Sequence, residues 1–216
     1  MTQELTLHEE RTAVSELGRQ MLEQGLTKGT GGNISARRGD RVAISPSGMA
    51  YGDIEPEDVS VVDLHGERVD GDRKPSSEVR MHTDVLRERN DVGGVVHTHS
   101  PYASTFASLG QPVEASHYPI AFIGDRIPVA AYETYGTQAL AESALEALGE
   151  EYNACLLEKH GVLAVGDDVK AAFKVALMVE YCARIHYQAL NIGDPDLLAD
   201  NEIDNLMDRF ADYGQN

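Results

Sequence analysis

The stretch GGVVHTH, residues 93–99, combines the features of a buried strand with two histidines. Its apolar run predicts a strand that is covered on both faces. Side chains alternate across a strand, so His97 and His99 are expected to point to the same side. Two neutral imidazoles on one side suit a divalent metal such as zinc. The stretch therefore predicts a buried strand that carries part of a metal site.

A third imidazole and a carboxylate are available elsewhere in the chain. His160 is a candidate because Gly161 follows it, and a glycine permits a tight bend between two strands. Glu78 is the natural carboxylate, although a glutamate at a helix start can also serve only the helix dipole. Three imidazoles with an exchangeable fourth position are typical of a catalytic metal site. Four of the other five histidines have no second ligand nearby in the sequence: His8, His65, His82 and His186. We interpret His82 and His186 as helix-surface or core residues.

Helix and strand patterns interleave along the chain. Amphipathic or capped patterns predict helices over residues 8–24, 75–89, 102–109, 137–148, 169–190 and 201–210. Apolar runs predict strands over residues 41–45, 59–64, 93–99, 127–132, 153–158 and 161–165. The interleaving indicates the α/β class, and the short hairpin-like connections favour a mixed or largely antiparallel sheet. No repeat or linker divides residues 1–216, so we expect a single domain.

The composition excludes several classes of protein. Eighteen Lys and Arg against thirty-six Asp and Glu give a net charge of −18, which opposes binding to a nucleic-acid backbone. The apolar runs are too short to span a bilayer, and the polar, acidic N-terminus is not typical of a secretory signal. The two cysteines, Cys155 and Cys182, form no disulfide or zinc-finger pattern. We therefore expect a cytoplasmic protein that binds neither nucleic acid nor membrane.

The acidity has a second interpretation. Only five of the eighteen basic residues are lysine, and strong acidity with few lysines favours a halophilic protein whose self-repulsion is screened by concentrated salt. An acidic protein that works at ordinary salt concentrations is the alternative. Greatest stability and activity near zero added salt would contradict the halophilic interpretation.

Three loops rich in small residues could hold a phosphate with neutral donors. In residues 29–33 (GTGGN) the glycines permit close approach of the backbone and Asn33 supplies an amide, but the lysine and spacing of a Walker loop are absent. Residues 45–48 (SPSG) repeat this pattern. Ser76 and Ser77 stand at a helix start, where hydroxyls and free N–H groups suit a phosphate beside Glu78.

Taken in order, the motifs GTGGNIS, SPSGM, PSSE, HTHSPYA, HYP, YGT and EKHG resemble the class II aldolase/adducin family. The resemblance covers nearly the whole chain and is strongest to the L-fuculose-1-phosphate aldolases. It implies a three-layer α/β/α fold around the sheet. It also implies zinc held by His97, His99 and His160, with Glu78 ligating the resting metal and then serving as the base.

The resemblance implies further site residues and an oligomer. The phosphate of dihydroxyacetone phosphate would be held by Thr30, Asn33, Ser47, Gly48, Ser76 and Ser77. Tyr118 matches a tyrosine that reaches a neighbouring subunit's site and donates a proton, and Tyr213 matches a C-terminal tyrosine near the substrate. Tyr135 stands where the fuculose enzymes have phenylalanine, which leaves the aldehyde preference open. The family pattern implies a homotetramer with sites between subunits.

We therefore expect a zinc-dependent aldolase that reversibly cleaves a ketose 1-phosphate, such as L-fuculose 1-phosphate, into dihydroxyacetone phosphate and a short aldehyde such as lactaldehyde. Manganese or cobalt could occupy the same ligands. On the same fold, a methylthioribulose-1-phosphate-type dehydratase or a pentulose-phosphate 4-epimerase is the alternative. A Schiff-base aldolase that uses Lys159 or Lys74, and a non-catalytic binding head, are weaker interpretations because they leave the histidines unexplained.

Overall fold

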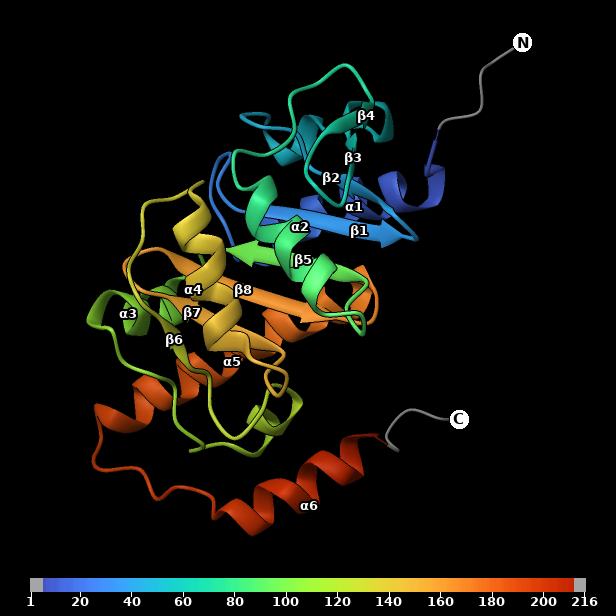
Figure 1. Ribbon diagram of the computed structural model, residues 1–216. Helices are drawn as coiled ribbons and strands as arrows, with labels where there is room; N and C mark the ends of the chain where they lie inside the picture. The colour runs from blue at the N-terminus through green and yellow to red at the C-terminus, as the bar shows by residue number, and fades with distance from the viewer. Residues whose placement is uncertain (1–5, 212–216) are drawn as a thin grey trace.

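The computed structural model describes residues 6–211, which are built around one eight-stranded sheet (Figure 1). The strands follow the order β4-β3-β2-β1-β5-β8-β7-β6 across the sheet. Their bounds are β1 Asn33–Arg38, β2 Arg41–Ile44, β3 Ser60–Asp63, β4 Arg68–Asp70, β5 Gly94–Thr98, β6 Val129–Ala130, β7 Ala154–Leu157 and β8 Gly161–Gly166. Neighbouring strands pair antiparallel except β6 and β7, which run parallel. The predicted α/β class with a mixed, largely antiparallel sheet is confirmed.

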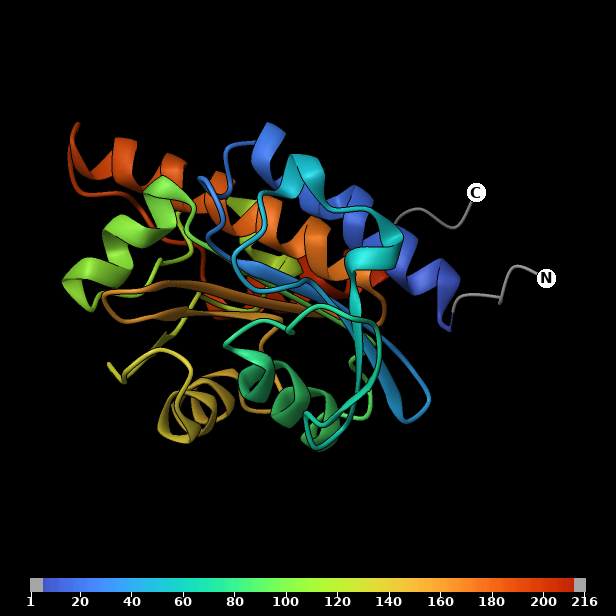
Figure 2. The same cartoon turned by 90° about the horizontal axis from the view of Figure 1, so that it is seen from above.

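Helices cover both faces of the sheet, and Figure 2 shows the three layers edge-on. The helices are α1 His8–Glu23, α2 Val79–Glu88, α3 Pro101–Leu109, α4 Gln138–Leu148, α5 Val169–Leu190 and α6 Asp200–Ala211, with short 3₁₀ turns η1 Tyr51–Asp53, η2 Pro56–Asp58 and η3 Tyr118–Phe122. One core lies between the sheet and α1, α3 and α5, and a second lies between the sheet and α2 and α4. None of the helices in residues 6–211 is long and apolar enough to cross a membrane.

Strand β5 is central to this arrangement, as its sequence predicts. Val96 packs into the core under α1 and α5, whereas Val95 packs into the core under α2 and α4. The two glycines before them allow α5 to begin close by, because a Cβ on Gly94 would lie 2.3 Å from the Cα of Val169. A strand that is buried on both faces therefore places His97 near its C-terminal end, where the site forms.

The structure corrects three details of the sequence-based elements. The strand predicted over residues 127–132 is reduced to β6, because Pro128 has no N–H to donate and Ile127 instead exchanges hydrogen bonds with Val113. Strand β1 escaped prediction because only Ile34 and Ala36 interrupt its polar sequence. The cap of α2 is Glu78 and not a serine, although Ser76 Oγ accepts a hydrogen bond from the Glu78 N–H. The single domain over residues 1–216 stays a prediction.

Candidate metal and substrate site

The three predicted imidazoles meet at one end of the central strands. His97 lies near the end of β5, His99 follows β5 directly, and His160 lies in the turn between β7 and β8. Because β8 pairs with β5 and places Leu163 opposite His97, the turn is brought to the end of β5. One ring nitrogen from each histidine lies within 4.8 Å of the others. The convergence of His97, His99 and His160 is therefore present in the fold.

This convergence depends on glycines that let the segments approach closely. A Cβ on Gly161 would lie 2.2 Å from the Thr98 carbonyl oxygen and 3.0 Å from Cδ2 of His99. A Cβ on Gly31 would lie 2.8 Å from Nδ1 of His99. Lys159, just before His160, adopts a left-handed backbone conformation with φ of 56°. The turn that carries His160 can thus lie against the other two histidines because Gly31 and Gly161 have no side chains that would separate these segments.

The hydrogen bonds of His97 fix which of its nitrogens faces the site. His97 Nδ1 lies 2.8 Å from the Val162 carbonyl oxygen, which can only accept, so Nδ1 carries the proton. The lone pair of Nε2 then faces His99 Nε2 at 3.0 Å. Burial lowers the pKa of His97 to about 3, and burial together with His160 also lowers the pKa of His99. Neutral imidazoles whose lone pairs converge are the ligands that a divalent metal requires.

Glu78 lies beside two of the three imidazoles. Its Oε2 is 3.3 Å from His97 Nε2, and its Oε1 is 3.6 Å from His160 Nε2. Burial by itself raises the pKa of Glu78, but the neighbouring imidazoles of His97 and His160 and a hydrogen bond from Asn33 lower it, and the net shift is downward. Within residues 6–211, buried Oε1 of Glu78 and Nδ1 of His160 have no hydrogen-bond partner. Three imidazoles and an ionised carboxylate with an unpartnered oxygen fit a divalent cation such as zinc.

All six residues predicted to hold a phosphate line one cavity together with Glu78, His99 and His160. The cavity has a volume of about 350 Å³, enough for a small sugar phosphate, and its predicted lining comprises Thr30, Asn33, Ser47, Gly48, Ser76 and Ser77. Two backbone hydrogen bonds hold the serine loops together, from Ser47 N to Lys74 O at 2.9 Å and from Ser76 N to Ser45 O at 3.1 Å. Neutral donors from three loops thus surround the space beside the imidazoles.

The cavity also includes Tyr132 and Glu133, which the sequence did not single out. Tyr132, Glu133 and Lys159 line it, as does Tyr135. Tyr132 and Lys159 are linked through Glu158, which accepts a hydrogen bond from Tyr132 N at 3.2 Å and forms an ion pair with Lys159 Nζ. In the sequence, Lys159 is a candidate Schiff-base nucleophile, whereas nothing marks Tyr132 or Glu133. The loop after β6 gives no local signal of its own.

Two predicted tyrosines are not in the cavity formed by this chain. Tyr118 lies on η3, where 53% of it is exposed and its ring stacks on Phe210 of α6 with centroids 6.1 Å apart. It does not line the cavity with Glu78. Tyr213 lies outside the residues that the structure describes. The position of Tyr118 is compatible with a role in a neighbouring chain's site, and incompatible with one in the site of its own chain as the structure stands.

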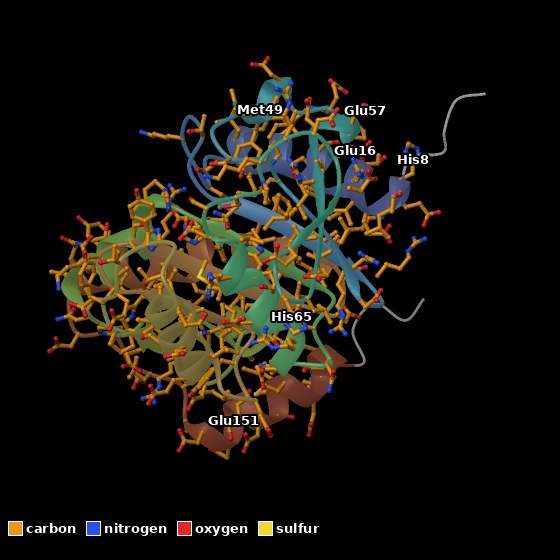
Figure 3. The ribbon with its side chains drawn as sticks, turned by 45° about the horizontal axis from the view of Figure 1, so that its top comes forward. His8, Glu16, Met49, Glu57, His65 and Glu151 are labelled. Carbon is orange, nitrogen blue, oxygen red and sulfur yellow. The ribbon has the colours of Figure 1, made fainter. Side chains whose placement is uncertain are left out.

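The four histidines named above without a second ligand are not part of the metal cluster. His8 and His65 lie exposed on the outer surface (Figure 3). His186 is a core residue whose Nδ1 lies 2.8 Å from Ser116 Oγ. His82 is also a core residue, fully buried, and burial lowers its pKa to about 4. However, His82 hydrogen-bonds Asn33, which lines the cavity, so His82 contacts the site indirectly.

Comparison with known proteins identifies the family. The Class II Aldolase and Adducin N-terminal domain matches residues 12–187. The chain belongs to the class II aldolase and adducin family. A solved structure of L-fuculose 1-phosphate aldolase shares the fold with a TM-score of 0.91 and 40% identity, covering 94% of this chain and 96% of the other. With the histidine cluster, family membership makes this chain a metal-dependent class II aldolase of sugar phosphates.

Two characterised members of the family are more similar to this chain than that structure is. The 5-deoxy-D-ribulose 1-phosphate aldolase of Bacillus thuringiensis serovar kurstaki is 48% identical over 98% of this chain and 100% of its own length. The 5-methylthioribulose-1-phosphate/5-deoxyribulose-1-phosphate aldolase of Rhodospirillum rubrum is 44% identical over 95% of this chain and 93% of its own length. The family expected from the sequence is confirmed, but the expected strongest likeness to the fuculose aldolases gives way to these two enzymes.

Proposed function

We propose that this aldolase cleaves a ribulose 1-phosphate that carries no hydroxyl at C5, namely 5-deoxyribulose 1-phosphate or its 5-methylthio analogue. The observation that carries the proposal is the 48% identity, over nearly the full length of both chains, to an aldolase named for the first of these substrates. The 44% identity to an aldolase named for both supports it. This substrate replaces the L-fuculose 1-phosphate expected from the motifs.

The chemistry of this substrate follows from an aldol cleavage between C3 and C4. Carbons 1 to 3 leave as dihydroxyacetone phosphate, and carbons 4 and 5 leave as acetaldehyde or its methylthio derivative. These aldehydes lack the hydroxyl of lactaldehyde, so their outer end needs an apolar wall and no hydrogen-bond partner. Tyr132 and Tyr135, which line the cavity, offer aromatic rings for that end.

We assign the residues of the cavity to the two halves of the reaction. His97, His99 and His160 would hold zinc with Glu78, and zinc would supply Lewis-acid stabilisation of charge at the ketone oxygen. Glu78, within reach of the same space, would remove the C3 proton as the carboxylate in condensation, and would return a proton to C3 as the carboxylic acid in cleavage. The phosphate, held by the six loop residues named above, fixes the orientation of C1 to C3.

The proton on the C4 hydroxyl requires a second group. We assign it to Tyr118 of a neighbouring subunit, whose hydroxyl would take up this proton in cleavage while passing its own proton to water, and would donate a proton to the aldehyde oxygen in condensation. This assignment needs an oligomer, and we propose the homotetramer of the family pattern. Tyr213, which lies outside the described residues, is proposed to act near the substrate. The halophilic interpretation of the acidic surface also stays a proposal, supported only by composition.

The alternative is a different reaction on the same substrate. A methylthioribulose-1-phosphate dehydratase releases water and keeps all five ribulose carbons in one product, and a 4-epimerase only inverts one centre. Neither forms dihydroxyacetone phosphate. The two relatives named above, both aldolases, favour carbon–carbon cleavage.

A comparison of substrates tests the proposal. Purified enzyme with zinc is given 5-deoxyribulose 1-phosphate or L-fuculose 1-phosphate, and dihydroxyacetone phosphate is measured by coupled reduction with NADH. We expect kcat/KM to be at least about tenfold higher for the deoxyribulose substrate, the difference that roughly 1.4 kcal/mol of transition-state stabilisation produces. A preference for L-fuculose 1-phosphate would contradict the proposed substrate. Consumption of substrate without dihydroxyacetone phosphate would contradict the proposed cleavage.

A further inference from the structure

A buried row of hydrogen bonds leads from strand β1 through helix α2 to the carboxylate of Glu78. Ser35 Oγ lies 2.7 Å from Nδ1 of His82, and Nε2 of His82 hydrogen-bonds Oδ1 of Asn33. Asn33 Nδ2 then donates to Glu78 Oε2 at 2.8 Å. All four residues are buried. Asn33 and Ser35 share one face of β1, and Glu78 and His82 are spaced by four residues at the start of α2, so two elements alternate in the row.

The polarity of this row is fixed by its ends. A carboxylate can only accept, so the Asn33 NH₂ group must face Glu78 and its carbonyl must face His82. The carbonyl can also only accept, so Nε2 of His82 must carry a proton. A fully buried imidazole is neutral, and Nδ1 therefore accepts from the hydroxyl of Ser35. Every donor in the row points toward Glu78.

We propose that His82 is a positioning residue, which holds the Asn33 amide in the one orientation that turns both of its N–H bonds toward anions. One N–H donates to Glu78. The other is available to the cavity, which Asn33 lines and where our proposed function places the substrate phosphate. A flipped amide would bring its oxygen within 2.8 Å of the carboxylate oxygen, and both atoms carry negative charge. The N–H of His82 Nε2 gives the Asn33 carbonyl a partner in this orientation and none in the flipped one, so without it only the contact with Glu78 selects the orientation.

The inference rests on the proposed function only for the phosphate, so its test includes measurements that need no substrate. In protein labelled with ¹⁵N-histidine, long-range ¹H–¹⁵N correlation reports which ring nitrogen is protonated. We expect His82 to be protonated at Nε2 and His97 to be protonated at Nδ1, because their acceptors are Asn33 Oδ1 and Val162 O respectively. A proton on Nδ1 of a neutral His82 would overturn the polarity and the proposal with it.

Variants at residue 82 separate positioning from packing. His82→Gln keeps a donor near Nε2, His82→Asn keeps only the partner of Ser35, and His82→Leu keeps neither. We expect zinc affinity, measured by competition with a chelator, and kcat to fall about 10- to 100-fold in His82→Leu and His82→Asn, the usual cost of losing the support of a metal ligand. We expect His82→Gln to recover most of both. His186→Leu is the matched control, because it removes another buried histidine that contacts a serine.

The outcomes distinguish the two proposals. Equal losses in His82→Gln and His82→Asn, or losses as large in His186→Leu, would overturn the positioning role in favour of simple packing. If His82→Leu does not fold, the Gln and Asn variants still decide. Expected tautomers and zinc affinities, in an enzyme that does not cleave 5-deoxyribulose 1-phosphate, would support the positioning role and reject the proposed substrate.

Discussion

The geometry of the site requires that residue 161 have no side chain. Gly161 follows His160 directly and passes so close to Thr98 that a Cβ would lie 2.2 Å from the carbonyl oxygen. The same Cβ would lie 3.3 Å from Cε1 of His97. The residue therefore controls how closely the turn of β7 and β8 can approach the end of β5.

Gly161→Ala should displace His160 from the other two imidazoles. We expect a loss of about 2 kcal/mol in the free energy of unfolding, typical of overpacking, and weaker zinc binding. Urea unfolding and zinc titration measure the two effects. Gly52→Ala is the control, because no atom within 4 Å would meet a Cβ there. Unchanged zinc affinity in Gly161→Ala would show that the close approach is not required.

Buried histidines make the stability of the metal-free protein depend on pH. Burial lowers the pKa of His82 from 6.5 to about 4, so in this range the unfolded chain binds a proton that the folded chain does not. The contribution of this difference to the free energy of unfolding is fully present above pH 6.5. It is lost as the pH falls toward 4, by about 3 kcal/mol in total. His97, whose pKa is lowered to about 3, acts in the same direction. Urea unfolding across this range should show the decline, with a shallower slope in His82→Gln. A flat profile would contradict these shifts.

At the scale of elements, α5 illustrates a helix whose start is separate from the site. Its cap is Asp168, whose Oδ1 accepts a hydrogen bond from Ala171 N at 2.7 Å. The helix packs on the face of the sheet opposite α2, which carries Glu78. A substitution at Asp168 can therefore change the stability of the protein without changing the metal and substrate site.

Asp168→Ala should lower the free energy of unfolding by about 1 kcal/mol, since it removes the side chain that caps the start of α5. We expect zinc affinity and kcat to be unchanged, because Asp168 does not line the cavity. Asp168→Asn keeps an acceptor and should lose much less stability. A large loss of activity in Asp168→Ala would indicate a coupling between α5 and the site that the structure does not explain.

The sequence predicted elements well where burial was continuous and poorly where it was not. Helix α5 and strand β5 follow apolar patterns, and their predicted bounds agree with the structure to within a residue. Strand β1 carries Asn33 and Ser35, whose polar side chains are satisfied by α2, and only tertiary structure reveals this. His82 is a core residue, one of the two possibilities expected from the sequence, but only the folded structure reveals its contacts with Ser35 and Asn33. The loop with Tyr132 joins the cavity through folding and not through any local pattern.

At the scale of the whole molecule, the role proposed for Tyr118 requires an assembled enzyme, because Tyr118 does not line the cavity of its own chain. Subunit mixing tests this: Tyr118→Phe and Glu78→Gln proteins, each inactive alone, are unfolded together and refolded. If each site combines Glu78 of one chain with Tyr118 of another, roughly a quarter of the sites regain both groups. We expect cleavage activity to recover to about that level in the mixture and not in either protein refolded alone. No recovery would mean that Tyr118 serves no neighbouring site.

The most direct test of the central claim, that the three imidazoles and Glu78 hold a catalytic metal, is metal content measured together with cleavage. Protein purified without chelator is analysed by mass spectrometry for metals, dialysed against EDTA, assayed with 5-deoxyribulose 1-phosphate, and reconstituted with zinc. We predict about one divalent ion per chain, loss of dihydroxyacetone phosphate formation on chelation, and its return with zinc. His97→Ala should neither retain the ion nor recover. Full cleavage activity in protein shown to contain no metal would contradict the account.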